Sequence, residues 1–136
     1  MTVRRLRRTS GLLTSALLVA LLLVACGGGG DDGGGGKAYV EPKGEATEQI
    51  EISAKNFSFT PDKITTDAGI AEITLESTGG IHDLVFANGY QGFRLDEVRT
   101  GESDSKKIDL TKGTYTFYCS LPGHRAAGME GTITVK

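Results

Sequence analysis

Hydrophobic and polar residues alternate along most of the chain after residue 48. Ile50 and Ile52 alternate with Glu51 and Ser53, and the same period of two returns over residues 71–77. This alternation predicts half-buried β-strands. Further strands are expected over residues 56–59, 63–66, 82–86, 106–110, 114–119 and 131–135.

Glycine- and proline-containing turns separate the expected strands. They lie at residues 61–62, 67–69, 78–80 and 111–113. Gly79 and Gly80 would let the backbone approach a neighbouring side chain closely. Residues 87–105 predict a long crossover loop, with one helical turn around Leu95–Val98. Short strands parted by turns indicate an all-β sandwich or barrel.

The first 25 residues have the composition of an export signal. Four arginines between residues 4 and 8 precede a Leu-rich apolar stretch, which predicts a signal peptide over residues 1–25. A membrane-spanning helix is the alternative, but it would need about 20 apolar residues. Leu23-Val24-Ala25-Cys26 resembles a bacterial lipobox, so Cys26 is expected to carry the lipid and become the new N-terminus. The paired arginines leave twin-arginine export open.

Residues 26–47 are expected to connect this anchor to the folded domain. The run from Gly27 to Gly36 has almost no side chains for a core, which is typical of a flexible tether. Residues 37–47 are mostly polar and are expected to stay flexible as well. The folded domain is therefore predicted over residues 48–136.

Charge and cysteine content narrow the functional classes. From residue 48 onward, nine Lys or Arg stand against thirteen Asp or Glu, so no basic surface for nucleic acid is indicated. If Cys26 is lipidated, Cys119 is left as an unpaired thiol in an exported chain. A disulfide between Cys26 and Cys119 is the alternative, although the chain lacks the cysteine density of a disulfide-stapled domain.

Candidate metal ligands gather near the C-terminus. Cys119, His124 and Met129 form the pattern C-x4-H-x4-M, and His82, the chain's other histidine, lies in a predicted strand of the same domain. Each residue alone has an ordinary structural explanation, since methionines fill cores and histidines often end strands. Together they offer a thiolate, two imidazoles and a weak axial thioether, which is the donor set of a blue-copper site. The sequence therefore predicts one type I copper ion.

The segment F-Y-C-S-L-P-G-H at residues 117–124, with Met129 and His82, resembles the cupredoxin family of blue copper proteins, of auracyanin, plastocyanin and azurin type. The resemblance covers roughly residues 48–136. It implies a Greek-key β-sandwich that carries single electrons. It also implies that His82, Cys119 and His124 are the close copper ligands and Met129 the long axial one.

With the lipobox, the resemblance implies a membrane-tethered carrier that cycles Cu(II)/Cu(I) between redox partners such as a cytochrome or a copper enzyme. We expect an exported monomer, held by its N-terminal lipid at the outer face of the cell membrane or in the periplasm. The alternative is a lipoprotein that stores or delivers copper. An enzyme is not expected, because two histidines cannot also build a second copper centre.

Two neighbours of the expected ligands carry further hypotheses. Asp83 follows His82 where cupredoxins usually have Asn, and its carboxylate could accept hydrogen bonds from the Ser120 region. Its charge would favour Cu(II) and lower the reduction potential; a solvated Asp83 that points outward is the alternative. Around His124, small and apolar residues interrupted by Arg125 are expected to form a flat docking face.

Overall fold

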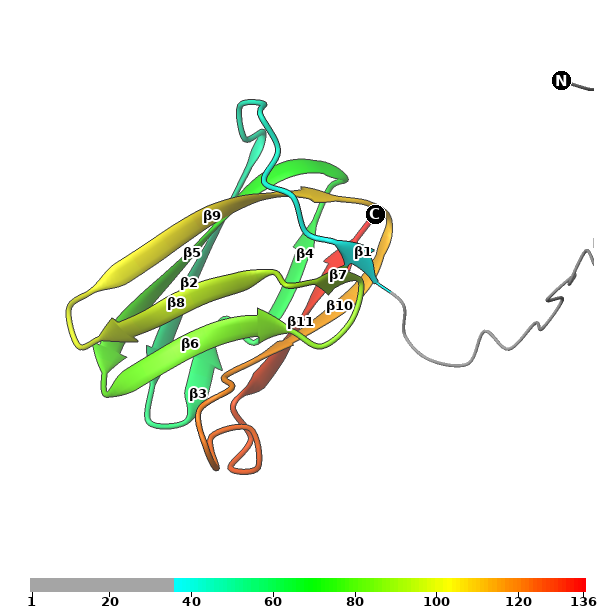
Figure 1. Ribbon diagram of the computed structural model, residues 1–136. Helices are drawn as coiled ribbons and strands as arrows, with labels where there is room; N and C mark the ends of the chain where they lie inside the picture. The colour runs from blue at the N-terminus through cyan, green and yellow to red at the C-terminus, as the bar shows by residue number, and fades with distance from the viewer. Residues whose placement is uncertain (1–35) are drawn as a thin grey trace, which may run out of the picture. The chain divides into compact units, whose positions relative to one another are not determined.

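The computed structural model describes residues 36–136, whose main body consists of two twisted β-sheets packed face to face (Figure 1). One sheet has five strands in the order β4-β11-β10-β6-β8, and the other has four in the order β3-β2-β5-β9. The strands are β2 (Glu48–Lys55), β3 (Ser58–Thr60), β4 (Lys63–Thr66), β5 (Gly69–Gly79), β6 (Ile81–Phe86), β8 (Arg94–Arg99), β9 (Ser103–Leu110), β10 (Gly113–Tyr118) and β11 (Glu130–Val135). The predicted all-β Greek-key sandwich is confirmed.

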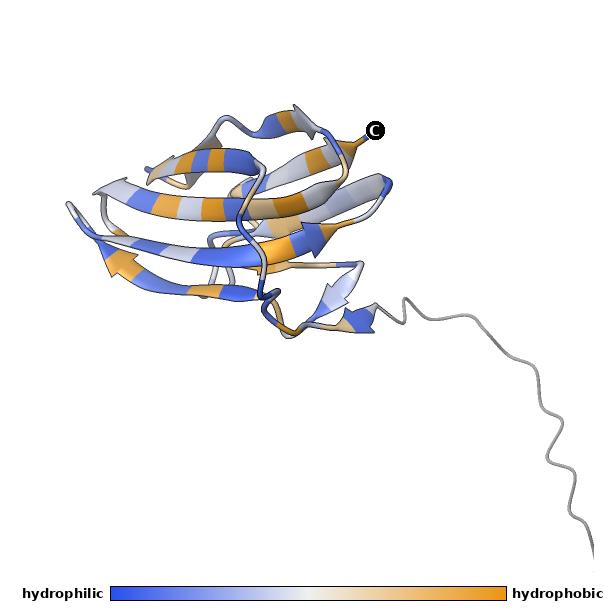
Figure 2. Cartoon of the chain, turned by 90° about the horizontal axis from the view of Figure 1, so that it is seen from above, coloured by the Kyte–Doolittle hydropathy of each residue, from blue (hydrophilic) through white to orange (hydrophobic). Residues whose placement is uncertain are grey.

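The core lies between the sheets because each strand turns its apolar positions inward. In β5, Ala71, Ile73 and Leu75 are fully buried, while the residues between them reach the outer face. Figure 2 shows this alternation as short hydrophobic and hydrophilic bands along the strands. The period of two in the sequence therefore reports the two faces of each sheet.

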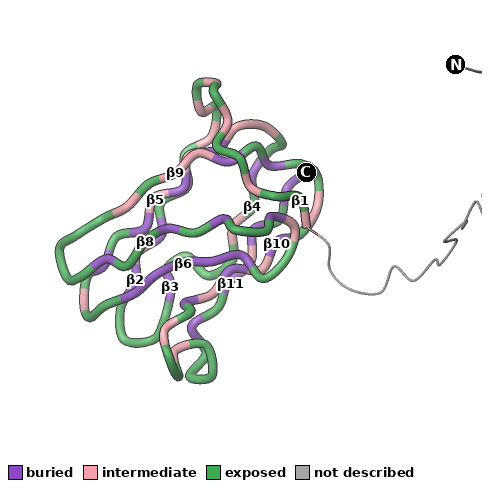
Figure 3. Tube along the Cα trace, viewed as in Figure 1, coloured by how far each residue is buried: buried purple, intermediate pink, exposed green. Residues whose placement is uncertain are grey.

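Strand β6 departs from this alternation. Every residue after Ile81 is buried, as the continuous purple of β6 in Figure 3 shows. Two of these buried residues, His82 and Asp83, are polar. Buried polar side chains need hydrogen-bond partners or ligands. The beginning of β6 is therefore a candidate functional region of the sandwich.

The prediction of one strand through residues 56–59 is wrong at its start. Asn56 and Phe57 have φ angles of 50° and 62° and form a turn that joins β2 to β3. Asparagine tolerates this left-handed region well, but phenylalanine rarely adopts it. The turn leaves Phe57 at the surface, with 49% of its area exposed.

The expected long loop over residues 87–105 is largely extended chain. It holds β7 (Tyr90–Gln91), β8 and the beginning of β9, and the predicted helical turn at Leu95–Val98 is wrong. Leu95 and Val98 are buried because β8 pairs with β6 through a register shift, which breaks the strict alternation. Because of this irregularity, β8 shows no alternation with a period of two in the sequence.

Part of the segment 37–47, which is expected to belong to the flexible tether, contacts the folded domain. Strand β1 (Lys37–Ala38) pairs with β7, and Tyr39 packs edge-to-face on Phe93 with ring centroids 5.0 Å apart. The Tyr39 hydroxyl also donates a 2.9 Å hydrogen bond to the Lys107 carbonyl. We call residues 36–47 the N-terminal strap; its contacts come from distant strands, so its own composition could not predict them.

The predicted signal peptide (residues 1–25), Cys26 and most of the glycine-rich run lie outside the described residues. Within residues 36–136, no helix has the length and apolar character that a membrane crossing requires.

The strap contacts generate a stability prediction. Replacing Tyr39 by alanine removes the packing on Phe93 and the bond to Lys107, and should lower the free energy of unfolding by about 2 kcal/mol. Urea denaturation of the fragment Asp32–Lys136, which forms one compact unit, measures this value. Val40→Ala is the matched control, because Val40 is 80% exposed; equal effects of the two variants would show that the Tyr39 contacts do not contribute to stability.

Candidate metal centre

Separate segments of the chain meet at one end of the five-stranded sheet. Strand β10 lies between β6 and β11 and is antiparallel to both, so the loop after β10 starts beside β6 and ends at β11. This loop, residues 119–129, is the orange excursion that projects from one end of the sandwich in Figure 1. We call it the ligand loop.

Three of the predicted ligands come together there. Donor atoms of His82, Cys119 and His124 all lie within 4.8 Å of one another. Nδ1 of His124 is 3.3 Å from Sγ of Cys119. Cys119 and His82 are buried, and His124 is half-buried. Two imidazoles and one sulfur therefore converge in a largely buried site.

The orientation of His82 is set by the glycine turn before β6. Its Nε2 lies 2.8 Å from the Gly79 carbonyl and donates to it, so Nδ1 carries the free lone pair. Nδ1 is buried and has no hydrogen-bond partner among the described residues. A Cβ at Gly80 would lie 3.1 Å from His82 Nε2, and Gly80 has a φ of 94°. The close backbone approach expected at Gly79 and Gly80 is thus present, and it leaves a buried acceptor in need of a partner.

Cys119 is a free, fully buried thiol. Burial raises the pKa of this thiol, and the nearby Asp83 carboxylate raises it further, while backbone N–H groups of Asp83 and Leu121 lower it. The metal-free protein therefore holds Cys119 protonated at neutral pH. A metal ion that binds the thiolate must displace this proton.

Met129 lies at the end of the ligand loop with no exposed surface. Its backbone N–H donates to the His124 carbonyl, and its own carbonyl accepts from the Cys119 N–H. These two hydrogen bonds tie Met129 to both loop donors and close the loop on itself. All four predicted ligands thus belong to one local structure, whereas Cys26 lies outside the described residues.

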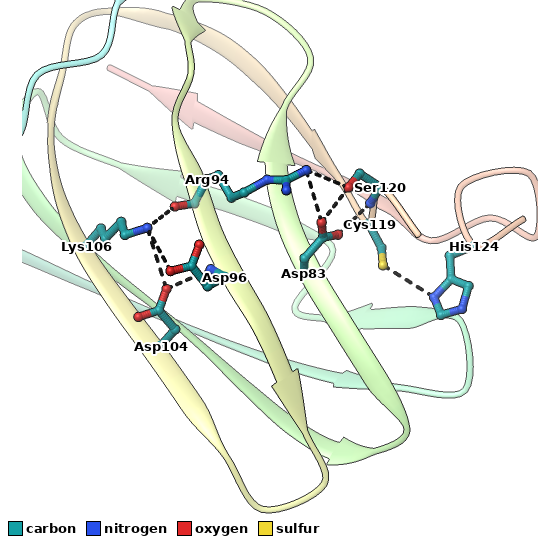
Figure 4. Close-up of polar contacts among 8 residues, drawn as sticks. All are labelled: Asp83, Arg94, Asp96, Asp104, Lys106, Cys119, Ser120 and His124. Atoms are coloured by element: carbon teal, nitrogen blue, oxygen red, sulfur yellow. Dashed lines mark hydrogen bonds and ion pairs between the residues drawn. The ribbon is translucent and has the colours of Figure 1, made fainter. Parts of the chain in front are cut away.

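Asp83 joins strand β6 to the ligand loop. Its carboxylate is 1% exposed; Oδ1 accepts a 2.6 Å hydrogen bond from the Ser120 N–H, and Oδ2 accepts from the Ser120 hydroxyl (Figure 4). The expected bond to the Ser120 region is confirmed, and the outward-pointing alternative is wrong. Ser120 follows Cys119 directly, so this contact fixes the loop beside the residue that follows His82.

A mostly apolar surface surrounds His124. Phe57 meets the His124 ring edge-to-face with centroids 4.8 Å apart, and together with Ile81, which is 41% exposed, it borders a shallow groove of about 600 Å³. Pro122 and Leu121 line the same groove. Phe57 and Ile81 were absent from the expected docking face, because only the unusual turn at residues 56–57 brings Phe57 to it.

Arg125 does not add a free positive charge to this face. Its guanidinium lies 2.6 Å from a Glu130 carboxylate oxygen and 4.0 Å from the centre of the Tyr118 ring. The charge of Arg125 is therefore offset by Glu130 at the surface, and a role for Arg125 in docking stays a prediction. The side chain instead joins the ligand loop to the adjoining ends of β10 and β11.

The site fits a soft metal ion of low coordination number. Sulfur and imidazole donors in a buried site suit copper, whereas magnesium and calcium prefer oxygen donors. The unpartnered Nδ1 of His82 supplies the structural test, because a buried lone pair without a hydrogen-bond donor is explained by a bound cation.

Sequence comparisons agree with this chemistry. The sequence model of one family, described as copper binding proteins of the plastocyanin/azurin family, matches residues 46–136. A plastocyanin from Dryopteris crassirhizoma is 41% identical over 95 residues, which cover 60% of this chain and 90% of that protein.

Solved structures resemble the same part of the chain. Auracyanin B matches with a TM-score of 0.63 and 21% identity, covering 71% of this chain and 94% of the other. A dithionite-reduced auracyanin from Roseiflexus castenholzii matches with a TM-score of 0.55 and 22% identity, covering 68% and 99%. At these identities the structural likeness establishes the fold, while the copper chemistry rests on the family match and the site.

The raised pKa of the Cys119 thiol predicts how the stability of the metal-free protein depends on pH. The unfolded chain loses this proton near pH 8.5, while the native thiol keeps it to higher pH. The stabilisation is therefore complete below about pH 8.5 and is lost as pH rises towards the native pKa. Urea unfolding of the metal-free fragment between pH 7 and 10.5 should show a steeper loss of stability than in Cys119→Ser. Equal slopes would contradict the assignment of this titration to Cys119.

Proposed function

Because the chain belongs to the plastocyanin/azurin family of copper-binding proteins, we propose that it is a one-electron carrier with a single blue-copper site. Bound copper supplies the redox chemistry, accepting and returning one electron as it cycles between Cu(II) and Cu(I). The observation that carries the proposal is the convergence of two imidazoles and one thiol within 4.8 Å at a buried end of the sandwich.

We assign the copper to four residues of this chain. His82 through Nδ1, Cys119 and His124 would be the close ligands, and Met129 the weak axial one. The free lone pair on His82 and the 3.3 Å contact between Cys119 and His124 support the close set. The backbone bonds that bind Met129 to the loop support its place beside them.

The surroundings of these residues favour rapid electron transfer. The Gly79 carbonyl fixes His82, the Ser120–Asp83 bonds fix the start of the loop, and hydrogen bonds within the loop fix its end. Ligands held this way change position little when the charge of the ion changes. A small rearrangement lowers the barrier to each one-electron step, because little protein motion accompanies it.

The half-buried His124 is our candidate electron port. It is the predicted ligand with the most surface exposure, and apolar side chains of Phe57, Ile81 and Pro122 surround it. An exposed apolar patch of this kind is typical of a contact site. Transient redox partners need only a small interface, so we propose that a redox protein, such as a cytochrome or a copper enzyme, docks here.

The N-terminal sequence supports export and tethering. We propose that residues 1–25 are removed as a signal peptide, that Cys26 carries lipid, and that the domain is held at the outer face of the cell membrane or in the periplasm. Since the strap is ordered from residue 36, the tether would comprise only the glycine-rich residues 27–35. A random coil of this length has a reach of roughly 17 Å, which keeps the domain close to the lipid surface.

The first test is the spectrum of the fragment Asp32–Lys136 after addition of one equivalent of Cu(II). We expect an intense blue absorption band and a narrow copper hyperfine splitting in the EPR spectrum, because a copper–thiolate bond gives both. Cys119→Ser should lose both features, since serine offers no thiolate.

A second measurement separates an electron carrier from a copper store. The carrier should give a reversible one-electron couple and keep its copper in the presence of a competing chelator. A colourless, readily exchanged ion would contradict the proposal and favour copper storage or delivery.

The docking face generates its own prediction. Phe57→Asn keeps a residue that tolerates a φ of 62° but removes the apolar ring. Electron exchange with a protein partner, or self-exchange followed by NMR line broadening, should slow by roughly fivefold. Reduction by a small molecule such as ascorbate should be unchanged. The control is Val40→Asn, an exposed position on the strap; if both variants slow exchange equally, the face around His124 is not the port.

A further inference from the structure

Asp83 is an unusual neighbour for a copper site, because it places a carboxylate in a buried position. It accepts hydrogen bonds from the backbone N–H and the hydroxyl of Ser120. Both contacts come from hydrogen-bond donors, as suits a carboxylate, whose oxygens accept hydrogen bonds. A buried negative charge is costly unless a positive group is close to it.

Arg94 on strand β8 supplies that positive group. Its Nη2 lies 3.5 Å from Oδ2 of Asp83 and donates a 2.9 Å hydrogen bond to the Ser120 hydroxyl (Figure 4). Within residues 36–136, no other ion pair involves Asp83. The Arg94 side chain is 51% exposed, so it reaches the buried carboxylate from the surface.

A separate interaction holds the backbone of Arg94. The Lys106 ammonium donates a 2.7 Å hydrogen bond to the Arg94 carbonyl and lies 3.5 Å from Asp96 and 3.9 Å from Asp104 (Figure 4). The charge of Lys106 is thus already matched by two acidic groups. The guanidinium of Arg94, by contrast, is directed at Asp83.

Charges beside the site act on the two oxidation states unequally. A negative charge stabilises Cu(II) more than Cu(I) and lowers the reduction potential, while a positive charge does the reverse. Asp83 lies beside the site, because it follows His82 directly and its carboxylate accepts hydrogen bonds from Ser120, the residue after Cys119. The potential therefore depends on how far the charge of Asp83 is offset.

We propose that Arg94 is a positioning residue that offsets the charge of Asp83, holds Ser120 against it, and so raises the reduction potential of the copper site. The inference rests on the proposed blue-copper function. The reduction potential would then depend on the hydrogen-bonded group of Asp83, Ser120 and Arg94. Arg94, the cation of this group, lies on a different strand from every proposed ligand.

The test is voltammetry of the copper-loaded fragment Asp32–Lys136 in a double-mutant cycle. Arg94→Gln should lower the potential, so that the Cu(I)/Cu(II) ratio at a fixed solution potential falls on the order of threefold, or about 28 mV at 59 mV per tenfold change. Asp83→Asn should raise the potential. In the Asp83→Asn background, Arg94→Gln should have almost no effect, because the carboxylate charge that Arg94 offsets is no longer present.

Two further variants separate the ion pair from general charge effects. Arg99→Gln removes the same charge from an exposed residue of the same strand that forms no ion pair within residues 36–136, and it should leave the potential nearly unchanged. Arg94→Lys keeps the charge and should stay closer to the original potential than Arg94→Gln. Urea unfolding of the metal-free variants provides a readout that is independent of copper, and Arg94→Gln should lower the midpoint only while Asp83 is present.

Three outcomes would overturn the inference. They are an unchanged or higher potential in Arg94→Gln, an equal effect of Arg99→Gln, and a full effect of Arg94→Gln when Asp83 is absent. A loss of stability without a change in potential would reduce Arg94 to a structural role and also contradict the proposal. Failure of the unmodified fragment to show a blue site would contradict the proposed function itself, so the two failures are distinguishable.

Discussion

The contact between Ser120 and Asp83 is the constraint on which the copper end of this protein depends. It joins residues 37 positions apart in the sequence, one beside Cys119 and the other beside His82. Hydrogen bonds to an ionised group in a buried site are stronger than those at the surface. They keep the ligand loop against β6, so the distance between the two donor segments is set before any metal arrives.

The same burial has a chemical consequence for the metal-free protein. Cys119 is held as a thiol, and His82 keeps a lone pair without a partner. The lone pair of His82 is unfavourable by itself, since a buried unsatisfied group lowers stability. A soft cation would satisfy this lone pair and would bind the Cys119 sulfur once the thiol proton is displaced.

The strap and the ligand loop lie at different parts of the five-stranded sheet. The strap pairs with β7 near the beginning of β10, while the ligands follow the end of β10 (Figure 1). The strap, residues 36–47, therefore leaves the face around His124 uncovered. The face that we propose for docking is thus separate from the strap.

Local patterns in the sequence determined most strands of the sandwich, with β8 as the exception, and the identity of the donor set. Alternation reports the two faces of a strand, and C-x4-H-x4-M needs only one loop to bring its members together. The order of residues 36–47, the exposure of Phe57 and the approach of Arg94 to Asp83 were decided by the tertiary structure. Each of these depends on strand pairing between distant residues or on a backbone irregularity, and neither leaves a periodic signal in the sequence. Chemistry signalled by residue type and spacing could thus be predicted, including His82 and the bond from Ser120 to Asp83, whereas the contacts of Tyr39, Phe57 and Arg94 appeared only in the folded molecule.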